Sequence, residues 1–307
     1  MEIVRINLSK NTVEYADVSD KWKDSDEGSV ISNIISDEVI PDCDPLGKNN
    51  KLVLAIGCEN SVNPADSIKF ILCTKSPLAN EIKETNIDGD FGLNLYGLGI
   101  KAIILEGQSK KWQTIYINKD GVKLLLADDV VGMGINDTIE YYSNKYERTN
   151  VISIGPAGEK QYLIAGIDIR SAEGLRYDYY EKVGFGAVMG AKKVKTILIN
   201  DENANKSFHG CQDKIRCSDY SYCKDKDSDI STANYDFTAI LNKKYGIKNQ
   251  DIIDRLNYFC TDYGIEYLEL SDTIGVAIEA GIVSHGDAIG FYSLRDEIIN
   301  GTLLGKI

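Results

Sequence analysis

The organisation of this chain follows from one stretch, Val183-Gly-Phe-Gly-Ala-Val-Met-Gly-Ala-Lys-Lys193. Its three glycines carry no side chain, so another group can approach the backbone closely. Two lysines end the stretch, and residues 194–199 then have the apolar composition of a buried strand. A glycine turn with cations beside it suits an anionic or flat cofactor. The alternative is a tight turn between two packed elements.

Length and composition indicate a folded protein with a substantial core. The chain has 307 residues, enough for one large domain or two smaller ones, and 43% of them are hydrophobic. Its formal net charge of −13 argues against nucleic acid or an anionic membrane as a partner. The apolar runs are too short to cross a bilayer, and the N-terminus lacks the long apolar segment of a signal peptide. We therefore expect a cytoplasmic location.

Periodicity divides the chain into a β-rich first part and a helical last part. Segments typical of strands lie before residue 200, whereas helical spacing dominates from Tyr235 onward. The predicted fold class is α+β. We expect a domain of antiparallel sheets with a few helices at 1–200, a polar connector with cysteines at 201–234, and a smaller all-helical domain at 235–307.

Individual elements can be predicted from the same patterns. Residues 2–8 and 12–16 predict one hairpin, and residues 112–126 predict another that turns at Lys119-Asp-Gly121. A helix over residues 252–259 would be capped by Asn249 or Asp251. Further strands are expected at 51–57, at 68–74, within 97–107, from 151 toward a glycine-rich turn at 158, at 162–169 and at 194–199. Further helices are expected near 29–35 and at 136–146, 273–280 and 288–299.

Four segments, taken in order, resemble a known family. They are Lys75-Ser-Pro-Leu78, Thr85-Asn-Ile-Asp-Gly-Asp-Phe-Gly92, Ile154-Gly-Pro-Ala-Gly-Glu159 and the glycine stretch itself. Together they resemble the cofactor-binding N-terminal domain of the aldehyde ferredoxin oxidoreductase family, the tungstopterin enzymes. The resemblance implies an oxidoreductase component that binds tungstopterin or molybdopterin and passes electrons from an aldehyde to ferredoxin.

The resemblance also assigns cofactor contacts to particular positions. The family has arginine at the positions of Lys69 and Lys182, and lysine keeps the charge but loses the planar fork of donors. Asp88 replaces a glycine and adds a carboxylate that should repel a phosphate-bearing cofactor. Glu266 ends a segment similar to a family Asp-x-x-Gly-Leu-Asp motif. The candidate cofactor-binding residues are Lys69, Asn86, Asp88, Gly89, Lys182, Gly184, Gly186 and Glu266.

Cysteines form a second candidate site. The chain has seven, an odd number that argues against a disulfide framework. The family binds a [4Fe–4S] cluster through Cys-x2-Cys-x3-Cys, whereas Cys211, Cys217 and Cys223 are each separated by five residues. Close spacing lets one loop point several sulfurs at a cluster. Three alternatives stay open: a cluster held by a longer loop, a structural zinc site that includes His209, and reduced, accessible thiols.

Two functions follow from the sequence. Complete family members carry a third domain with a further pterin-binding motif, and this sequence ends before any such motif. One function is an oxidoreductase component that is incomplete alone and works with a separately encoded remainder or with ferredoxin. The other is a non-catalytic relative that acts as an assembly, regulatory or small-molecule-binding scaffold, with no cofactor bound. In both cases we expect the isolated chain to be inactive, and any homodimer to lack the iron bridge of some relatives, because no histidine follows a glutamate by three residues.

Overall fold

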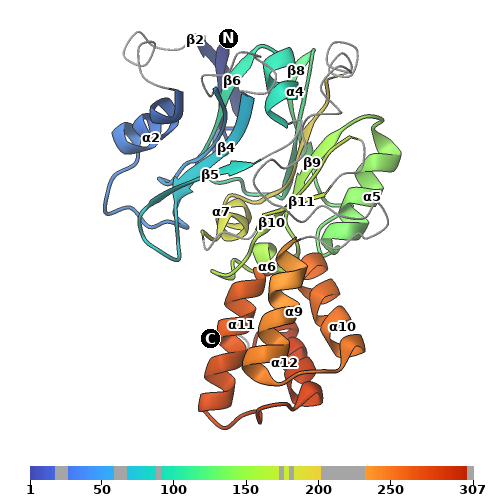
Figure 1. Ribbon diagram of the computed structural model, residues 1–307. Helices are drawn as coiled ribbons and strands as arrows, with labels where there is room; N and C mark the ends of the chain where they lie inside the picture. Colours follow the sequence, from blue (N-terminus) through green and yellow to red (C-terminus); the bar gives the residue numbers. More distant parts are fainter. Residues whose placement is uncertain are drawn as a thin grey trace.

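Two packed β-sheets stand on a bundle of helices (Figure 1). The computed structural model describes residues 1–17, 27–58, 68–87, 91–172, 176–179, 183–201 and 232–302. Figure 1 shows the sheets in the upper part, the bundle in the lower part, and the short helices α6 and α7 between them. The predicted α+β fold class is confirmed.

The first sheet has six strands in the order β2-β1-β6-β3-β4-β5. Its strands are β1 (Glu2–Asn7), β2 (Thr12–Asp17), β3 (Leu52–Cys58), β4 (Ile68–Lys75), β5 (Ile82–Ile87) and β6 (Ile100–Glu106). The predicted first hairpin is confirmed by antiparallel pairing of β1 with β2. Strands β1 and β6 run parallel, whereas the other pairs of this sheet are antiparallel.

The second sheet also has six strands, in the order β11-β10-β9-β12-β7-β8. Its strands are β7 (Gln113–Asn118), β8 (Gly121–Leu126), β9 (Asn150–Ser153), β10 (Ile167–Arg170), β11 (Arg176–Tyr179) and β12 (Val194–Ile199). The β7–β8 hairpin and strand β12 confirm two predictions. The predicted antiparallel sheets are each mixed, because β1 pairs parallel with β6 and β12 pairs parallel with β7. The long connections between those strands permit that direction, which alternation of side chains does not reveal.

The main core lies between the two sheets, because successive side chains of each strand point to opposite faces. Leu54 and Phe70 of the first sheet share this buried cluster with Ile115 and Ile197 of the second. The outer face of the first sheet is covered by α2 (Glu27–Glu38), and the outer face of the second by α5 (Ile135–Lys145). Burial of both faces explains why several strands are continuously apolar.

The short connecting elements differ from the sequence prediction. The expected turn at 183–190 is a helix, α7 (Phe185–Ala191), that begins after Gly184. The expected strand at 162–169 is shorter, because residues 163–164 form a turn and Ala165 makes only an isolated bridge, with Ile265, before β10 begins. The described part of the chain has two further short helices, α4 (Phe91–Gly97) and α6 (Pro156–Glu159).

Four helices form the lower bundle, namely α9 (Thr232–Tyr245), α10 (Gln250–Tyr263), α11 (Tyr267–Glu279) and α12 (Ala288–Asn300). Asn249 caps α10 by accepting a hydrogen bond from the Ile252 N–H at 3.3 Å, which confirms one of the two predicted caps. Helix α11 begins six residues before the expected segment at 273. The division of the chain into domains at residues 200 and 235 stays a prediction. Within the described residues, no helix has the length and apolar character needed to span a membrane.

Candidate functional site

The glycine stretch builds the junction between the sheets and the bundle. Gly184 precedes α7 with φ of 73°, a left-handed conformation that favours glycine. A Cβ atom there would lie 2.6 Å from the Leu163 carbonyl oxygen and 2.8 Å from Cγ of Pro77. Both the backbone angle and the space therefore require glycine at this position.

The next two glycines of the stretch pack against the backbone of this same chain. A Cβ on Gly186 would overlap the carbonyl oxygen of Gly166, and one on Gly190 would overlap that of Gly158. The Gly186 N–H donates to the Ala165 carbonyl oxygen at 2.9 Å. Tight packing between elements, the alternative to a cofactor cradle, thus accounts for the requirement for glycine. Cofactor contacts by Gly184 and Gly186 stay a prediction.

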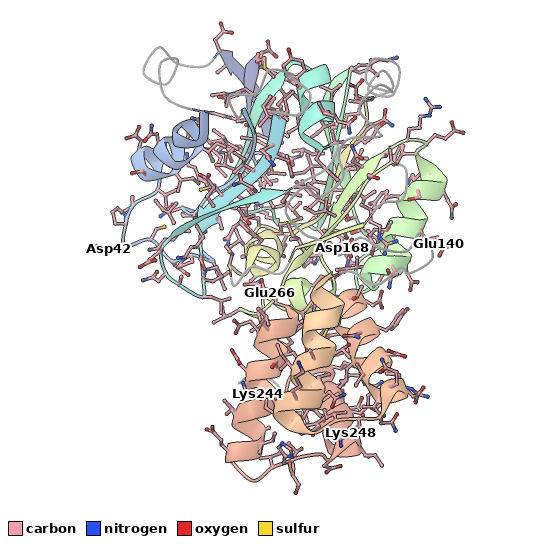
Figure 2. The ribbon with its side chains drawn as sticks, in the orientation of Figure 1. Asp42, Glu140, Asp168, Lys244, Lys248 and Glu266 are labelled. Atoms are coloured by element: carbon pink, nitrogen blue, oxygen red, sulfur yellow. The ribbon has the colours of Figure 1, made fainter. Side chains whose placement is uncertain are left out.

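One segment, residues 162–166, joins α7 to the bundle. Gly166 N–H donates to the Gly264 carbonyl oxygen at 3.0 Å, and Glu266 N–H donates to the Ile164 carbonyl oxygen at 3.1 Å. Glu266 directly precedes α11 and is only 2% exposed (Figure 2). The structure therefore gathers three sequence-predicted residues, Gly184, Gly186 and Glu266, around this segment.

The two lysines that end the stretch bind backbone carbonyl groups. Lys192 is 1% exposed, and its Nζ donates to the carbonyl oxygens of Asn50 at 2.6 Å and Gly107 at 3.1 Å. Burial lowers the pKa of Lys192 to about 7, although the charge of Glu106 opposes the shift. Lys193 donates to the Lys110 carbonyl oxygen at 3.0 Å. The two lysines therefore stabilise contacts between segments of this chain.

Sequence reasoning missed a buried ion pair beside α6. Lys195 is fully buried on β12, and its Nζ lies 2.6 Å from Glu159 Oε1 and 2.9 Å from the Met133 carbonyl oxygen. Burial lowers the pKa of Lys195, and attraction to Glu159 opposes that shift. The Glu159 carboxylate also accepts the Gly132 N–H at 3.0 Å. The signal available in the sequence was a lysine in a strand whose other residues, apart from Thr196, are apolar.

Two further candidates lie near the start of β4, the end of this strand that is far from the glycine stretch. Lys69 is half-buried near the start of β4, and Asn86 is exposed on β5 opposite Ile71. Ser76 directly follows β4 and contacts the glycine stretch, because its Oγ donates to the Val183 carbonyl oxygen at 2.8 Å. At the usual rise along a strand, Lys69 is roughly 23 Å from Ser76. Lys69 and Asn86 therefore lie apart from Gly184, Gly186 and Glu266, and pterin contacts by these residues stay a prediction.

The remaining predicted site residues lie outside the described residues. These are Asp88, Gly89, Lys182, Cys211, Cys217 and Cys223. Within the described ranges, no group of three or more His, Cys, Asp or Glu side chains is placed to hold a metal ion. Cys73 is a buried free thiol, and burial raises its pKa to about 12.

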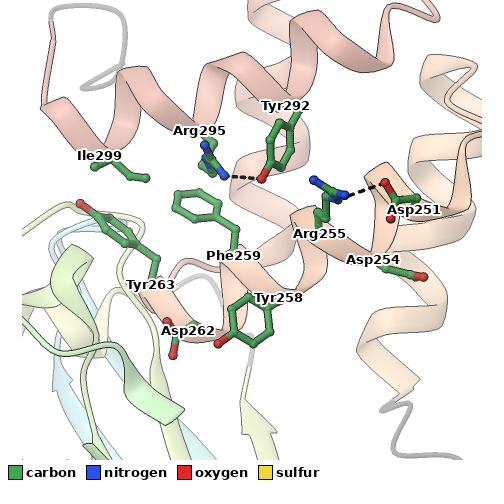
Figure 3. A pocket seen from close by; sticks show the side chains of 10 residues that line it. All are labelled: Asp251, Asp254, Arg255, Tyr258, Phe259, Asp262, Tyr263, Tyr292, Arg295 and Ile299. Atoms are coloured by element: carbon green, nitrogen blue, oxygen red, sulfur yellow. Dashed lines mark hydrogen bonds and ion pairs between the residues drawn. The ribbon is translucent and has the colours of Figure 1, made fainter. Parts of the chain in front are cut away.

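A groove of about 460 Å³ opens between α10 and α12 (Figure 3). Its aromatic floor includes Phe259 and Tyr263. Arg295 stacks on the Tyr292 ring with 4.2 Å to the ring centroid, and Arg255 pairs with an aspartate of its own helix. The two arginines of this groove are therefore already partnered.

A second cavity, of about 520 Å³, lies between α5 and the strands β9 and β10. It is lined by Asn136, Ile139, Glu140, Ser143, Tyr146, Arg148, Thr149, Val151, Arg170, Ser171 and Ala172. Neither cavity was predicted, because the walls come from elements that are distant in the sequence.

Comparisons with known proteins match both the sequence and the fold. The family described as "Aldehyde ferredoxin oxidoreductase, N-terminal domain" matches residues 3–201. A tungsten-containing aldehyde ferredoxin oxidoreductase of Thermococcus kodakarensis is 36% identical over 207 residues, which are 64% of this chain and 32% of that protein. The enzyme of the same description from Pyrococcus furiosus is 32% identical over 204 residues, with the same two shares. The chain therefore matches about a third of the length of these curated relatives.

Two more distant proteins are similar, one in sequence and one in fold. The aliphatic sulfonate oxidoreductase WOR-like subunit of Pyrococcus furiosus is 28% identical over 169 residues, 50% of this chain and 26% of that protein. The active site complex BamBC of benzoyl coenzyme A reductase, solved with 1,5-dienoyl-CoA, aligns with a TM-score of 0.72 at 18% identity. That alignment covers 99% of this chain and 60% of the other, so the likeness extends through the helical bundle. With the family match over residues 3–201, these findings establish that the chain belongs to the aldehyde ferredoxin oxidoreductase family.

Proposed function

We propose that this chain is a component of an aldehyde ferredoxin oxidoreductase-type enzyme and is incomplete on its own. The observation that carries the proposal is the family match over residues 3–201. The chain matches only about a third of the length of its curated relatives. In this proposal a separate part completes the enzyme, which works in the cytoplasm, oxidises an aldehyde to the acid and passes the electrons to ferredoxin. Tungstopterin or molybdopterin and a [4Fe–4S] cluster belong to that complete enzyme.

The packing around the glycine stretch supports a platform role for this chain. Lys192 ties the end of α7 to the backbone of Asn50 and Gly107, and Lys195 ties β12 to α6 through Glu159. Buried, hydrogen-bonded charges of this kind fix the elements that surround them. A large cofactor, or the part that completes the enzyme, would need a rigid binding surface, and the junction between the sheets and the bundle supplies one.

A non-catalytic scaffold is the second candidate, and a specific observation favours it. The spaces beside Gly184, Gly186 and Gly190 are filled by protein atoms, and Lys192 and Lys193 donate to carbonyl groups. A relative that keeps the family fold without its cofactor would act as an assembly, regulatory or small-molecule-binding scaffold.

Elemental analysis of the assembled protein distinguishes the two candidates. The chain would be tagged, recovered anaerobically from its own host, and assayed for tungsten, molybdenum, iron and aldehyde-dependent viologen reduction. We expect metal and activity in the recovered complex, and no activity in the chain purified alone. A complex without tungsten and molybdenum would contradict the oxidoreductase proposal and support the scaffold. Turnover by the pure chain would show that no completing part is needed.

A further inference from the structure

The cavity between α5 and the strands β9 and β10 has the size of a small-molecule site. Its volume of about 520 Å³ falls within the usual range for ligand pockets. Two arginines, Arg148 and Arg170, are among its lining residues, and Glu140 is its one carboxylate. None of these residues takes part in the junction described above.

Arg148 brings an uncommitted cation to the cavity. It is exposed in the turn that follows α5, where its φ of 51° is uncommon for a residue with a side chain. Its guanidinium makes no hydrogen bond or ion pair with any residue that the structure describes. A guanidinium is always charged and presents five N–H donors in a fixed fork, which matches a carboxylate or phosphate.

Arg170 is the second cation, and its position is fixed. One of its terminal nitrogens donates to Asn136 Oδ1 at 2.8 Å, and its Nε lies 3.6 Å from the buried carboxylate of Asp168. Asp168 lies nearer the middle of the molecule, whereas Glu140 lies on the outer side of α5 (Figure 2). Asp168 therefore offsets part of the charge of Arg170 from outside the lining, in which Glu140 is the one carboxylate.

Several polar groups of the wall can donate hydrogen bonds, and its two guanidinium groups can only donate. Besides the two arginines, the lining contains the amide of Asn136 and the hydroxyl groups of Ser143 and Tyr146. The Tyr146 ring is held by stacking on Tyr116, with 4.7 Å between centroids. A wall with many donors and one exposed carboxylate is complementary to a ligand that accepts hydrogen bonds and carries negative charge.

We propose that this cavity binds a small molecule with a compact oxyanion head, either a carboxylate or a phosphate, gripped by Arg148 and Arg170. The body of the ligand lies against the apolar part of the wall, which includes Ile139 and Val151. This site is independent of the function proposed above, because it shares no residue with the predicted cofactor contacts.

Calorimetric titration of the full chain with inorganic phosphate and with succinate, in a buffer free of other oxyanions, tests the proposal. We expect at least one probe to bind, and Arg148→Gln to weaken binding by about tenfold or more. Glu140→Gln should strengthen binding because it removes a like charge, and a poorly folded variant would not mimic this gain. Arg255→Gln, which removes an exposed arginine of the other groove, is the matched control and should leave affinity unchanged.

The two probes identify the oxyanion. Binding of phosphate alone indicates that the ligand has a phosphate head, and binding of succinate alone indicates a carboxylate head. Binding of both indicates that the cavity recognises either oxyanion. Arg170→Gln should also weaken binding, but its half-buried position requires a check of folding by circular dichroism. The proposal is overturned if neither probe binds, or if Arg148→Gln and Glu140→Gln both leave the affinity unchanged.

Discussion

A Cβ atom on Gly190 would lie 2.7 Å from the carbonyl carbon of Gly158 and overlap its oxygen. Helices α6 and α7 therefore meet backbone to backbone, without side chains between them. Gly158 is constrained in turn, because a Cβ there would lie 3.0 Å from the Gly186 carbonyl oxygen. The glycines of the opening stretch thus serve packing at the junction between the sheets and the bundle.

Replacing Gly190 with alanine should destabilise the protein strongly. The new methyl group meets backbone, which cannot rotate away, so we expect a loss of about 3 kcal/mol in the free energy of unfolding. Gly290→Ala is the control within a helix, because the added Cβ would meet the Asp287 side chain, which caps α12 and can rotate, instead of backbone. Urea titration should show a loss of about 1 kcal/mol for the control, as for a weakened helix cap. Equal effects of the two substitutions would contradict this account.

Asp262 of α10 caps a helix of the other part of the molecule. The residue before α5 is Gly134, which has no side chain, and Asp262 Oδ1 accepts the Asn136 N–H at 3.0 Å in its place. Asp262→Ala should cost about 1–2 kcal/mol, as loss of a helix cap does. Asp254→Ala, an exposed change on the same helix, should stay within about 0.5 kcal/mol. Similar unfolding midpoints for the two variants would show that this cap contributes nothing.

The Lys195–Glu159 pair should show strong energetic coupling. Each single change, Lys195→Met or Glu159→Gln, leaves one partner of a buried pair behind and should cost about 3 kcal/mol. The double variant should cost at least about 1 kcal/mol less than the sum, because neither charge is then stranded. The exposed Asp251–Arg255 pair supplies the control cycle, in which no coupling is expected. Additive losses at Lys195 and Glu159 would refute the coupling.

Lys192 should make stability depend on pH. Its pKa in the folded protein is about 7, whereas an unfolded lysine has a pKa of about 10.4. Between these values the unfolded chain binds more protons, so this residue makes stability rise as pH increases from about 7 toward about 10, by up to about 1.4 kcal/mol per pH unit. Lys192→Met is less stable overall, because two carbonyl groups lose their donor, but it should lack this slope. Denaturant titrations of both proteins across this pH range measure the slope. If the free energy of unfolding changes with pH equally in both, burial does not lower the pKa of Lys192.

The sequence predicted elements that depend on neighbouring residues. Alternation gave the β1–β2 and β7–β8 hairpins, because strands joined by a short turn can pair only antiparallel. The cap at Asn249 was predictable for the same reason, since its side chain reaches an N–H three residues on. Family motifs correctly pointed to the aldehyde ferredoxin oxidoreductase family.

The predicted site was harder, because its members are distant in the chain. Gly184, Gly186 and Glu266 meet around residues 162–166, whereas Lys69 lies near the far end of β4. A resemblance assigns a residue to a position in a motif and does not show which other residues lie beside it.

By itself the sequence determined the α+β class, most element positions and the need for glycine in the stretch from 183 to 193. Only the tertiary structure decided what fills the space beside those glycines, and it is the backbone of Gly158 and Gly166. It also decided that Asp262 would cap the helix that begins at Ile135, by accepting the N–H of Asn136, which lies 126 residues earlier in the chain. The physical reason is that local patterns fix backbone conformation, whereas burial, pairing direction and shared hydrogen bonds arise only when distant segments pack together.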